Sequence, residues 1–204
     1  MWQMLHCDRS TKTCWMERRK PVTIKQILKR KLVMIIRPET PSDIPAIYTV
    51  NQQVFDDRTA EPGLVDAVRQ SDGFLPELSL VAEQDGQIVG HILFSCIHIE
   101  TLQGNIPALA LAPMAVLPER QKQGIGSALV RHGLEECKRL GHAMVIVLGH
   151  PGYYPRFGFS ALMAKQLECP YGNCGDAWMA MELTPGALEG VQGKVVYPPA
   201  FDGV

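Results

Sequence analysis

The order of apolar and polar residues along the chain predicts a series of strands and helices. Six segments have the alternating or continuous apolar pattern of strands, and these are 34–37, 78–84, 88–99, 108–117, 143–148 and 178–183. Three segments with apolar residues three and four positions apart are typical of helices, and these are 44–54, 61–70 and 127–139. We therefore expect a mixed α/β fold in which helices flank a central sheet.

Turn residues between the predicted strands indicate how these strands pair. Asp85-Gly86 is a strong hairpin signal, and Gly104-Asn105 marks a second turn. The three strands between 78 and 117 are therefore expected to form an antiparallel meander. The helix over 127–139 would then return the chain across the sheet, so the strand at 143–148 would run parallel to the strand before that helix.

Charge is distributed unevenly along the 204 residues, which hold 20 basic and 21 acidic side chains for a net charge of −1. Residues 1–33 hold nine Lys/Arg and two Asp/Glu, a net +7, so the remaining chain holds eleven and nineteen, a net −8. We interpret residues 1–33 as an extension that is disordered or that reflects a start assigned too early, and 34–204 as the folded domain. A basic arm for nucleic acid or a membrane surface is the other interpretation.

Cysteine usage and hydropathy bear on the compartment. The six cysteines, at 7, 14, 96, 137, 169 and 174, form no C-x-x-C pair and no zinc-ribbon spacing. We expect reduced cysteines and no metal site, although Cys169 and Cys174 flank a turn where a disulfide or a metal role is open. The sequence contains no apolar run of 18 residues and no visible signal peptide. We therefore expect a cytoplasmic protein that does not enter the membrane.

The stretch 107–130 carries the strongest functional signal. An apolar run from Ala108 to Leu117, in which Pro113 predicts a bulge or an unpaired edge, leads through a polar loop to a helix start at Gly124-Ile125-Gly126. The first amides of a helix can bind an anion, and glycines let the backbone approach it closely. The dinucleotide pattern G-x-G-x-x-G lacks its third glycine here and no P-loop pattern occurs, so a Rossmann oxidoreductase is disfavoured.

Two motifs resemble the GNAT superfamily of N-acetyltransferases. The run 121–126, Q-K-Q-G-I-G, matches the acetyl-CoA loop of that family, Q/R-x-x-G-x-G/A, at every defined position. Residues 153–159 read Y-Y-P-R-F-G-F, which is similar to one subgroup's form of the family motif Y-x-x-x-G-F. The resemblance covers about residues 34–183 and implies a GNAT-like central mixed sheet, with an antiparallel meander followed by a parallel strand pair.

The resemblance assigns acetyl-CoA, as co-substrate, to the strand and the loop. Backbone groups of Met114, Ala115 and Val116 would pair with the pantetheine arm, and an amide there would polarise the thioester carbonyl. Arg120 and Lys122 would add charge near the phosphates or remain solvated, and the sequence leaves both roles open. The loop amides that would hold the pyrophosphate belong to Gln121, Lys122, Gln123, Gly124, Ile125 and Gly126.

A general acid is also implied by the resemblance. Tyr154 stands four residues before Gly158, at the position where the family often carries a tyrosine that protonates the departing thiolate. Simple packing beside the neighbouring phenylalanines is the alternative role for Tyr154, and Tyr153 is the alternative acid.

The general base is less defined, because the strand 108–117 contains no carboxylate. His150 follows the strand at 143–148 and is our candidate, since histidine suits proton transfer near neutral pH. His98, Glu100 and a water relay are the alternatives.

These observations together predict an acetyl-CoA-dependent N-acetyltransferase that moves an acetyl group to a primary amine by direct attack on the thioester. The acceptor would be a small-molecule or protein amine. The alternative is a non-catalytic acyl-CoA-binding or regulatory module on the same fold, which the missing strand carboxylate favours and Tyr154 argues against. Nucleic acid is not an expected partner, and the resemblance is compatible with a homodimer.

Overall fold

The computed structural model describes residues 34–55 and 60–202. The interpretations of residues 1–33 concern a segment outside these residues. The strands are β1 (Met34–Pro38), β2 (Phe74–Gln84), β3 (Gln87–Thr101), β4 (Gly104–Val116), β5 (Met144–Leu148), β6 (Leu167–Glu168), β7 (Trp178–Glu182) and β8 (Gly193–Val196). The α-helices are α2 (Ile44–Phe55), α3 (Ala60–Arg69) and α4 (Ile125–Arg139), and the 3-10 turns include η3 (Tyr154–Phe157) and η5 (Pro199–Phe201).

All six predicted strands and all three predicted helices are present, with shifted boundaries. β2 and β4 begin four residues earlier than predicted, at Phe74 and Gly104, because exposed Pro76 and Glu77 in β2 and exposed residues at the start of β4 interrupt the apolar pattern. α4 begins at Ile125 instead of Ser127, because Gly124 has a φ of 87° and forms the N-cap in a left-handed conformation that suits glycine.

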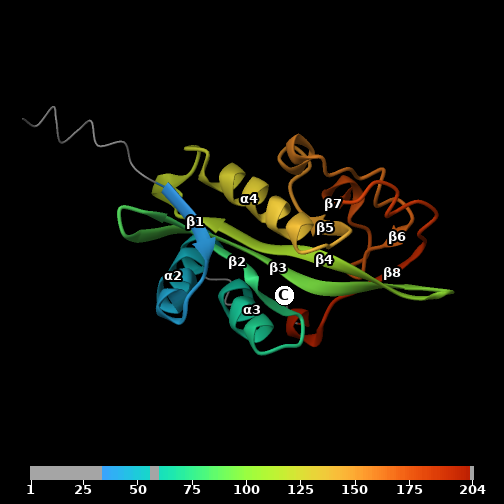
Figure 1. The fold of residues 1–204 in the computed structure, drawn as a ribbon, viewed down its shortest axis with the longest axis horizontal. Helices are drawn as coiled ribbons and strands as arrows, with labels where there is room; N and C mark the ends of the chain where they lie inside the picture. The colour runs from blue at the N-terminus through green and yellow to red at the C-terminus, as the bar shows by residue number, and fades with distance from the viewer. Residues whose placement is uncertain (1–33, 56–59, 203–204) are drawn as a thin grey trace, which may run out of the picture. The chain divides into compact units, whose positions relative to one another are not determined.

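The described residues form one eight-stranded sheet with the order β1-β2-β3-β4-β5-β7, and β8 pairs with both β3 and β6. β2 to β4 form the predicted antiparallel meander, and β4 and β5 are parallel, as predicted. β1 pairs antiparallel with β2. Helices α2 and α3 lie on one face of the sheet and α4 lies on the other (Figure 1). The main apolar core lies between these layers and includes Ile47, Phe94 and Leu129.

β4 bulges at Pro113, as the sequence predicts. Ile92 of β3 faces Met114, and Phe94 faces Leu111, so Ala112 and Pro113 together stand opposite a single residue of β3. On its other side β4 pairs with β5 at only two positions, both before the bulge. The two parallel strands therefore separate at the point where the functional stretch begins.

The expectation of reduced cysteines is wrong for one pair. Cys169 and Cys174 form a disulfide, because the turn between them, in which Gly172 has a φ of 89°, brings the two side chains together. Cys96 and Cys137 are free and pack in apolar surroundings, as expected. None of the helices among residues 34–55 and 60–202 is long and apolar enough to span a bilayer.

Candidate active site

The edge of β4 beyond its short pairing with β5 is open, since no described strand covers it there. The Leu117 amide donates to the Val89 carbonyl oxygen at 3.0 Å, so residue 117 faces β3. Because backbone groups alternate along an antiparallel ladder, Ala115 also faces β3, whereas Met114 and Val116 turn their backbone groups to the open edge. The sequence predicted the same backbone role for all three residues, whereas the register places only Met114 and Val116 at the open edge.

The loop from β4 to α4 places its amides at the positive end of a helix dipole. Gly124 caps the helix, and Ile125 and Gly126 form its first turn. Gln121 donates from Nε2 to the carbonyl oxygen of Val116 at 3.1 Å, which ties the start of the loop to the end of β4. The predicted anion-binding residues thus lie together at the helix start.

Tyr154 lies in η3, and its ring packs over the backbone of Gly149. A Cβ atom on Gly149 would stand 2.7 Å from Cδ2 of this ring and closer still to Cε2, so the ring position requires glycine there. The ring also contacts Phe159, with centroids 5.6 Å apart, and Tyr154 is 8% exposed. Burial raises the pKa of the Tyr154 phenol, and the neighbouring Tyr153 adds to this, so the hydroxyl stays protonated at neutral pH.

Tyr153 connects η3 to the first turn of α4. Its hydroxyl stands 3.0 Å from the position that a Cβ atom on Gly126 would take. The guanidinium of Arg156 lies 4.7 Å from the Tyr153 ring centroid, and Arg131 of α4 lies 5.4 Å from the centroid of Phe157. Neither arginine contact was predicted from the sequence, and the contact of Arg131 with Phe157 depends on how η3 packs against α4.

The candidate bases occupy different parts of the fold. His150 follows β5, lines the same cavity as Tyr154, and accepts a long 3.4 Å bond at Nδ1 from the Gly152 amide. His98 and Glu100 lie on the part of β3 that pairs with β8, with 4.0 Å between Nε2 and Oε1, and neither lines the cavity. The structure therefore does not support His98 or Glu100 as the base.

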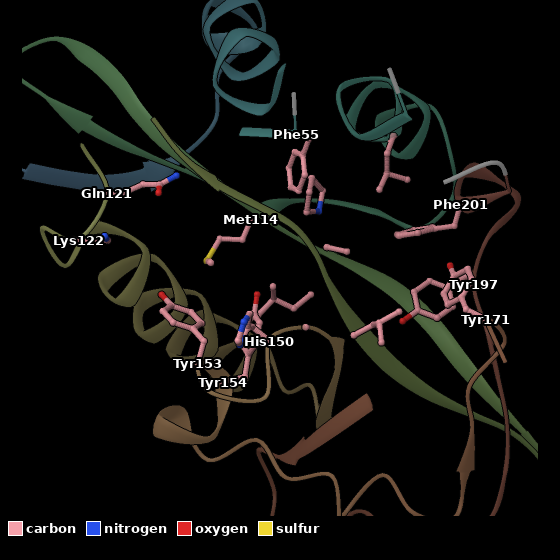
Figure 2. Close-up of a pocket in the computed structure, with 16 residues that line it drawn as sticks. Phe55, Met114, Gln121, Lys122, His150, Tyr153, Tyr154, Tyr171, Tyr197 and Phe201 are labelled. Carbon is pink, nitrogen blue, oxygen red and sulfur yellow. The ribbon is translucent and has the colours of Figure 1, made fainter. Parts of the chain in front are cut away.

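A single cavity of about 1140 Å³ joins these features (Figure 2). Gln121 and Lys122 lie at one end, and His150 and Met114 lie between this end and a group of aromatic side chains. Sites for one drug-sized ligand are usually about 300–1,000 Å³, so the cavity has room for a cofactor arm and a second substrate. The labelled lining residues are Phe55, Met114, Gln121, Lys122, His150, Tyr153, Tyr154, Tyr171, Tyr197 and Phe201.

A buried charged cluster, which the sequence analysis did not predict, lies outside the cavity lining. The Glu39 carboxylate accepts a 2.6 Å bond from Arg69 Nε and a bond from the Ser79 hydroxyl, and lies 3.6 Å from Nε2 of His91. Burial alone would raise the pKa of Glu39, but the nearby His91 and the hydrogen bonds from Arg69 and Ser79 lower it to about 2. Burial lowers the pKa of His91, so this imidazole is neutral at neutral pH. In the described part of the chain, no group of three His, Cys, Asp or Glu side chains is arranged to hold a metal ion.

The parallel strands β4 and β5 separate beside the glycine-capped start of α4, and the cavity follows the open edge of β4 towards that helix start. Residues 35–162 match the family model described as the acetyltransferase (GNAT) domain. The chain therefore belongs to the GNAT family of N-acetyltransferases.

Relatives and solved structures agree with this assignment. The chain is 37% identical over 171 residues to the uncharacterized N-acetyltransferase YhbS of Escherichia coli, covering 83% of this chain and 99% of YhbS. It is 36% identical over 147 residues to YjhQ of the same organism, an N-acetyltransferase also named as uncharacterized, covering 70% of this chain and 81% of YjhQ.

Two crystal structures of similar proteins contain the coenzyme. YhbS of E. coli in complex with CoA superimposes with a TM-score of 0.77 at 32% identity, covering 84% of this chain and 93% of YhbS. A GNAT acetyltransferase of Brucella melitensis in complex with acetyl-CoA superimposes with a TM-score of 0.68 at 35% identity, covering 83% of this chain and 99% of the other.

Proposed function

We propose that this protein transfers the acetyl group of acetyl-CoA to a primary amine by direct attack of the amine on the thioester. The observation that carries the proposal is that one cavity connects the open edge of β4, the loop before α4 and the Tyr154 ring. The CoA and acetyl-CoA bound by the E. coli and Brucella proteins support acetyl-CoA as the acetyl donor.

Acetyl-CoA would bind to backbone groups of β4 and of the loop before α4. Met114 and Val116 would pair with the pantetheine arm as an added strand would, and the register assigns Ala115 to β3 instead. The amides of the 121–126 run would hold the pyrophosphate at the start of α4, with Lys122 lining the cavity beside them.

The reaction forms one C–N bond and breaks one C–S bond. The amine nitrogen attacks the thioester carbon, and the amide of Met114 or Val116 donates to the oxygen that becomes negative. As the tetrahedral species collapses, the C–S bond breaks and the Tyr154 hydroxyl donates a hydrogen bond to the thiolate. The proton that the amine loses passes to solvent through His150 or a water molecule.

The raised pKa of Tyr154 defines how it acts. A free thiol has a pKa of about 8.5, so full proton transfer from a more weakly acidic phenol to the thiolate is unfavourable. Tyr154 would therefore stabilise the thiolate mainly as a hydrogen-bond donor. We expect Tyr154→Phe to lower kcat by about 10- to 100-fold with little change in KM for acetyl-CoA, and steady-state kinetics that show an unchanged kcat would contradict this role.

The described lining of the cavity contains no Ser, Thr or Cys side chain, which favours direct attack over an acetyl-enzyme formed on one of these residues. Initial rates at varied concentrations of both substrates should therefore follow a sequential pattern, and a ping-pong pattern would contradict direct attack.

Cofactor binding at the loop can be tested with two matched glycine variants. Gly124 and Gly141 stand at opposite ends of α4, have φ values of 87° and 85°, and leave open space for a Cβ atom. Wild type and Gly141→Glu should gain about 2.7 kcal/mol of stability from CoA at 100 times its Kd. Gly124→Glu should gain almost none, because its carboxylate would repel the phosphates. Equal stabilisation of both variants by CoA in thermal unfolding would contradict the proposed site.

The cytoplasmic location and the homodimer stay predictions.

A further inference from the structure

The cavity has an end that the proposed reaction leaves unused. Tyr171 in the 169–174 turn, Tyr197 after β8 and Phe201 in η5 line this space, and we call these three residues the aromatic end. Figure 2 shows Tyr171, Tyr197 and Phe201 gathered beyond Met114 and His150, on the side away from the loop residues. The 169–174 turn and the segment after β8 thus direct aromatic rings to one space.

Contacts with the rest of the protein hold most of this wall in place. The ring centroids of Tyr197 and Phe201 are 4.8 Å apart, and those of Tyr171 and Tyr197 are 5.6 Å apart. Phe201 is 5% exposed and packs in a small apolar cluster with Leu64 and Leu93. The wall is therefore formed in the protein without a ligand, which lowers the entropy lost on binding.

Tyr171 is the exposed member of the aromatic end. It is 45% exposed although it lines an apolar space, and it lies in the turn that the Cys169–Cys174 disulfide closes. An aromatic ring held in this way loses contact with water when an apolar group enters beside it, and that loss favours binding.

The distance between the aromatic end and the reacting atoms limits the size of the ligand. The cavity follows β4 from Leu111 to Met114, which face Phe94 and Ile92 of β3, and two residue steps along that strand span about 7 Å. Under the proposed function, the thioester carbon lies beside Met114. A ligand with its amine at this carbon and a short linker would place its remaining atoms among the rings.

We infer that the acceptor is a primary amine joined by a short linker to an aromatic group, and that the aromatic end binds this group. The inference rests on the proposed function, because it takes the amine to be the attacking nucleophile. Aromatic rings in a wall favour a flat partner through offset and edge-to-face contacts. A linear alkylamine or diamine would bury less surface against the same wall.

The test compares three amines at saturating acetyl-CoA, with release of the CoA thiol as the readout. The amines are 2-phenylethylamine, butylamine and 1,4-diaminobutane. We expect kcat/KM for 2-phenylethylamine to exceed the other two values by about tenfold or more, the factor that about 1.4 kcal/mol of additional aromatic contact provides.

Variants of Tyr171 connect this preference to the aromatic end. Tyr171→Ala should raise KM for 2-phenylethylamine by about 5- to 10-fold and leave KM for acetyl-CoA unchanged, whereas Tyr171→Phe, which keeps the ring, should behave like wild type. Tyr48→Ala is the matched control, since Tyr48 is 43% exposed on α2 and does not line the cavity. Thermal unfolding of each variant verifies that it is folded.

The outcomes separate this inference from the proposed function. Acetylation of the three amines with similar kcat/KM, or a preference for 1,4-diaminobutane, would overturn the inference and leave the proposed function in place. Binding of acetyl-CoA without acetylation of any of the three amines would also overturn the inference. Absence of stabilisation by acetyl-CoA would overturn the proposed function itself, and the inference with it.

Discussion

At the scale of single residues, the site depends on positions where a side chain is absent. Gly149 leaves the space that the Tyr154 ring fills, and Gly126 leaves the space beside the Tyr153 hydroxyl. These two glycines therefore determine where the phenol groups stand relative to the cavity. Neither effect depends on an unusual backbone angle, since Gly149 and Gly126 both lack a positive φ, in contrast to Gly124.

Gly149→Ala should displace the Tyr154 ring and lower kcat by about 10- to 100-fold, because a misplaced hydroxyl no longer reaches the departing thiolate. Gly63→Ala is the control, since Gly63 lies on α3 and a Cβ atom there meets nothing within 4 Å. Steady-state kinetics at saturating acetyl-CoA measure both variants. Equal kcat values for Gly149→Ala and wild type would show that the ring position does not matter for catalysis.

At the scale of elements, β4 links the two halves of the site. The bulge at Pro113 shifts the register of β4 against β3, and the strand then presents Met114 and Val116 to the open side. Gln121 fastens the following loop to this strand through the Val116 carbonyl. The strand edge and the helix start are thus held at a fixed separation, which a ligand that contacts both requires.

Gln121→Ala should weaken CoA binding by about 3- to 10-fold, because it removes a hydrogen bond of about 1 kcal/mol that holds the loop on β4. The matched variant Gln123→Ala removes a 3.1 Å bond within the loop, from Gln123 Nε2 to the Glu119 carbonyl, and should have the smaller effect. Calorimetric titration with CoA gives both dissociation constants. An equal loss in the two variants would argue against a special role for the tie to β4.

At the scale of the whole molecule, the buried Glu39 cluster links α3 to the sheet and makes stability depend on pH. Glu39 has a pKa of about 2 in the folded protein against an ordinary 4.5, so its contribution is present above pH 4.5 and is lost as the pH falls towards 2. The pKa of His91 is also lowered, by burial, so the unfolded chain takes up its proton first and stability declines below about pH 6.5.

Urea unfolding between pH 3 and pH 8 should therefore show a free energy of unfolding that decreases on acidification. The full Glu39 contribution is about 3 kcal/mol, from the pKa difference and 1.36 kcal/mol per pKa unit. Glu39→Gln should be less stable at pH 7 and should depend less on pH below 4.5. Glu135→Gln, which removes an exposed carboxylate on α4, should retain the wild-type slope. If the free energy of unfolding changes with pH by the same slope in wild type, Glu39→Gln and Glu135→Gln, Glu39 is not the source of the pH dependence.

The sequence by itself determined the features that depend on contiguous residues. Strand and helix periodicity, the Asp85-Gly86 hairpin, the bulge at Pro113 and the glycine loop before α4 were all predicted, because each is a local property of the backbone. The family assignment followed from two such local motifs, the runs 121–126 and 153–159, and the family model confirms it.

Only the tertiary structure decided which distant residues meet. Strand register turned Ala115 towards β3, and the pairing of β3 with β8 placed His98 and Glu100 outside the cavity lining. The aromatic end draws its rings from residues as far apart as Tyr171 and Phe201, and the Glu39 cluster draws on segments 30 to 52 positions away. Such contacts leave no periodic signal in the sequence, because they depend on how complete elements pack and not on the spacing of neighbouring residues.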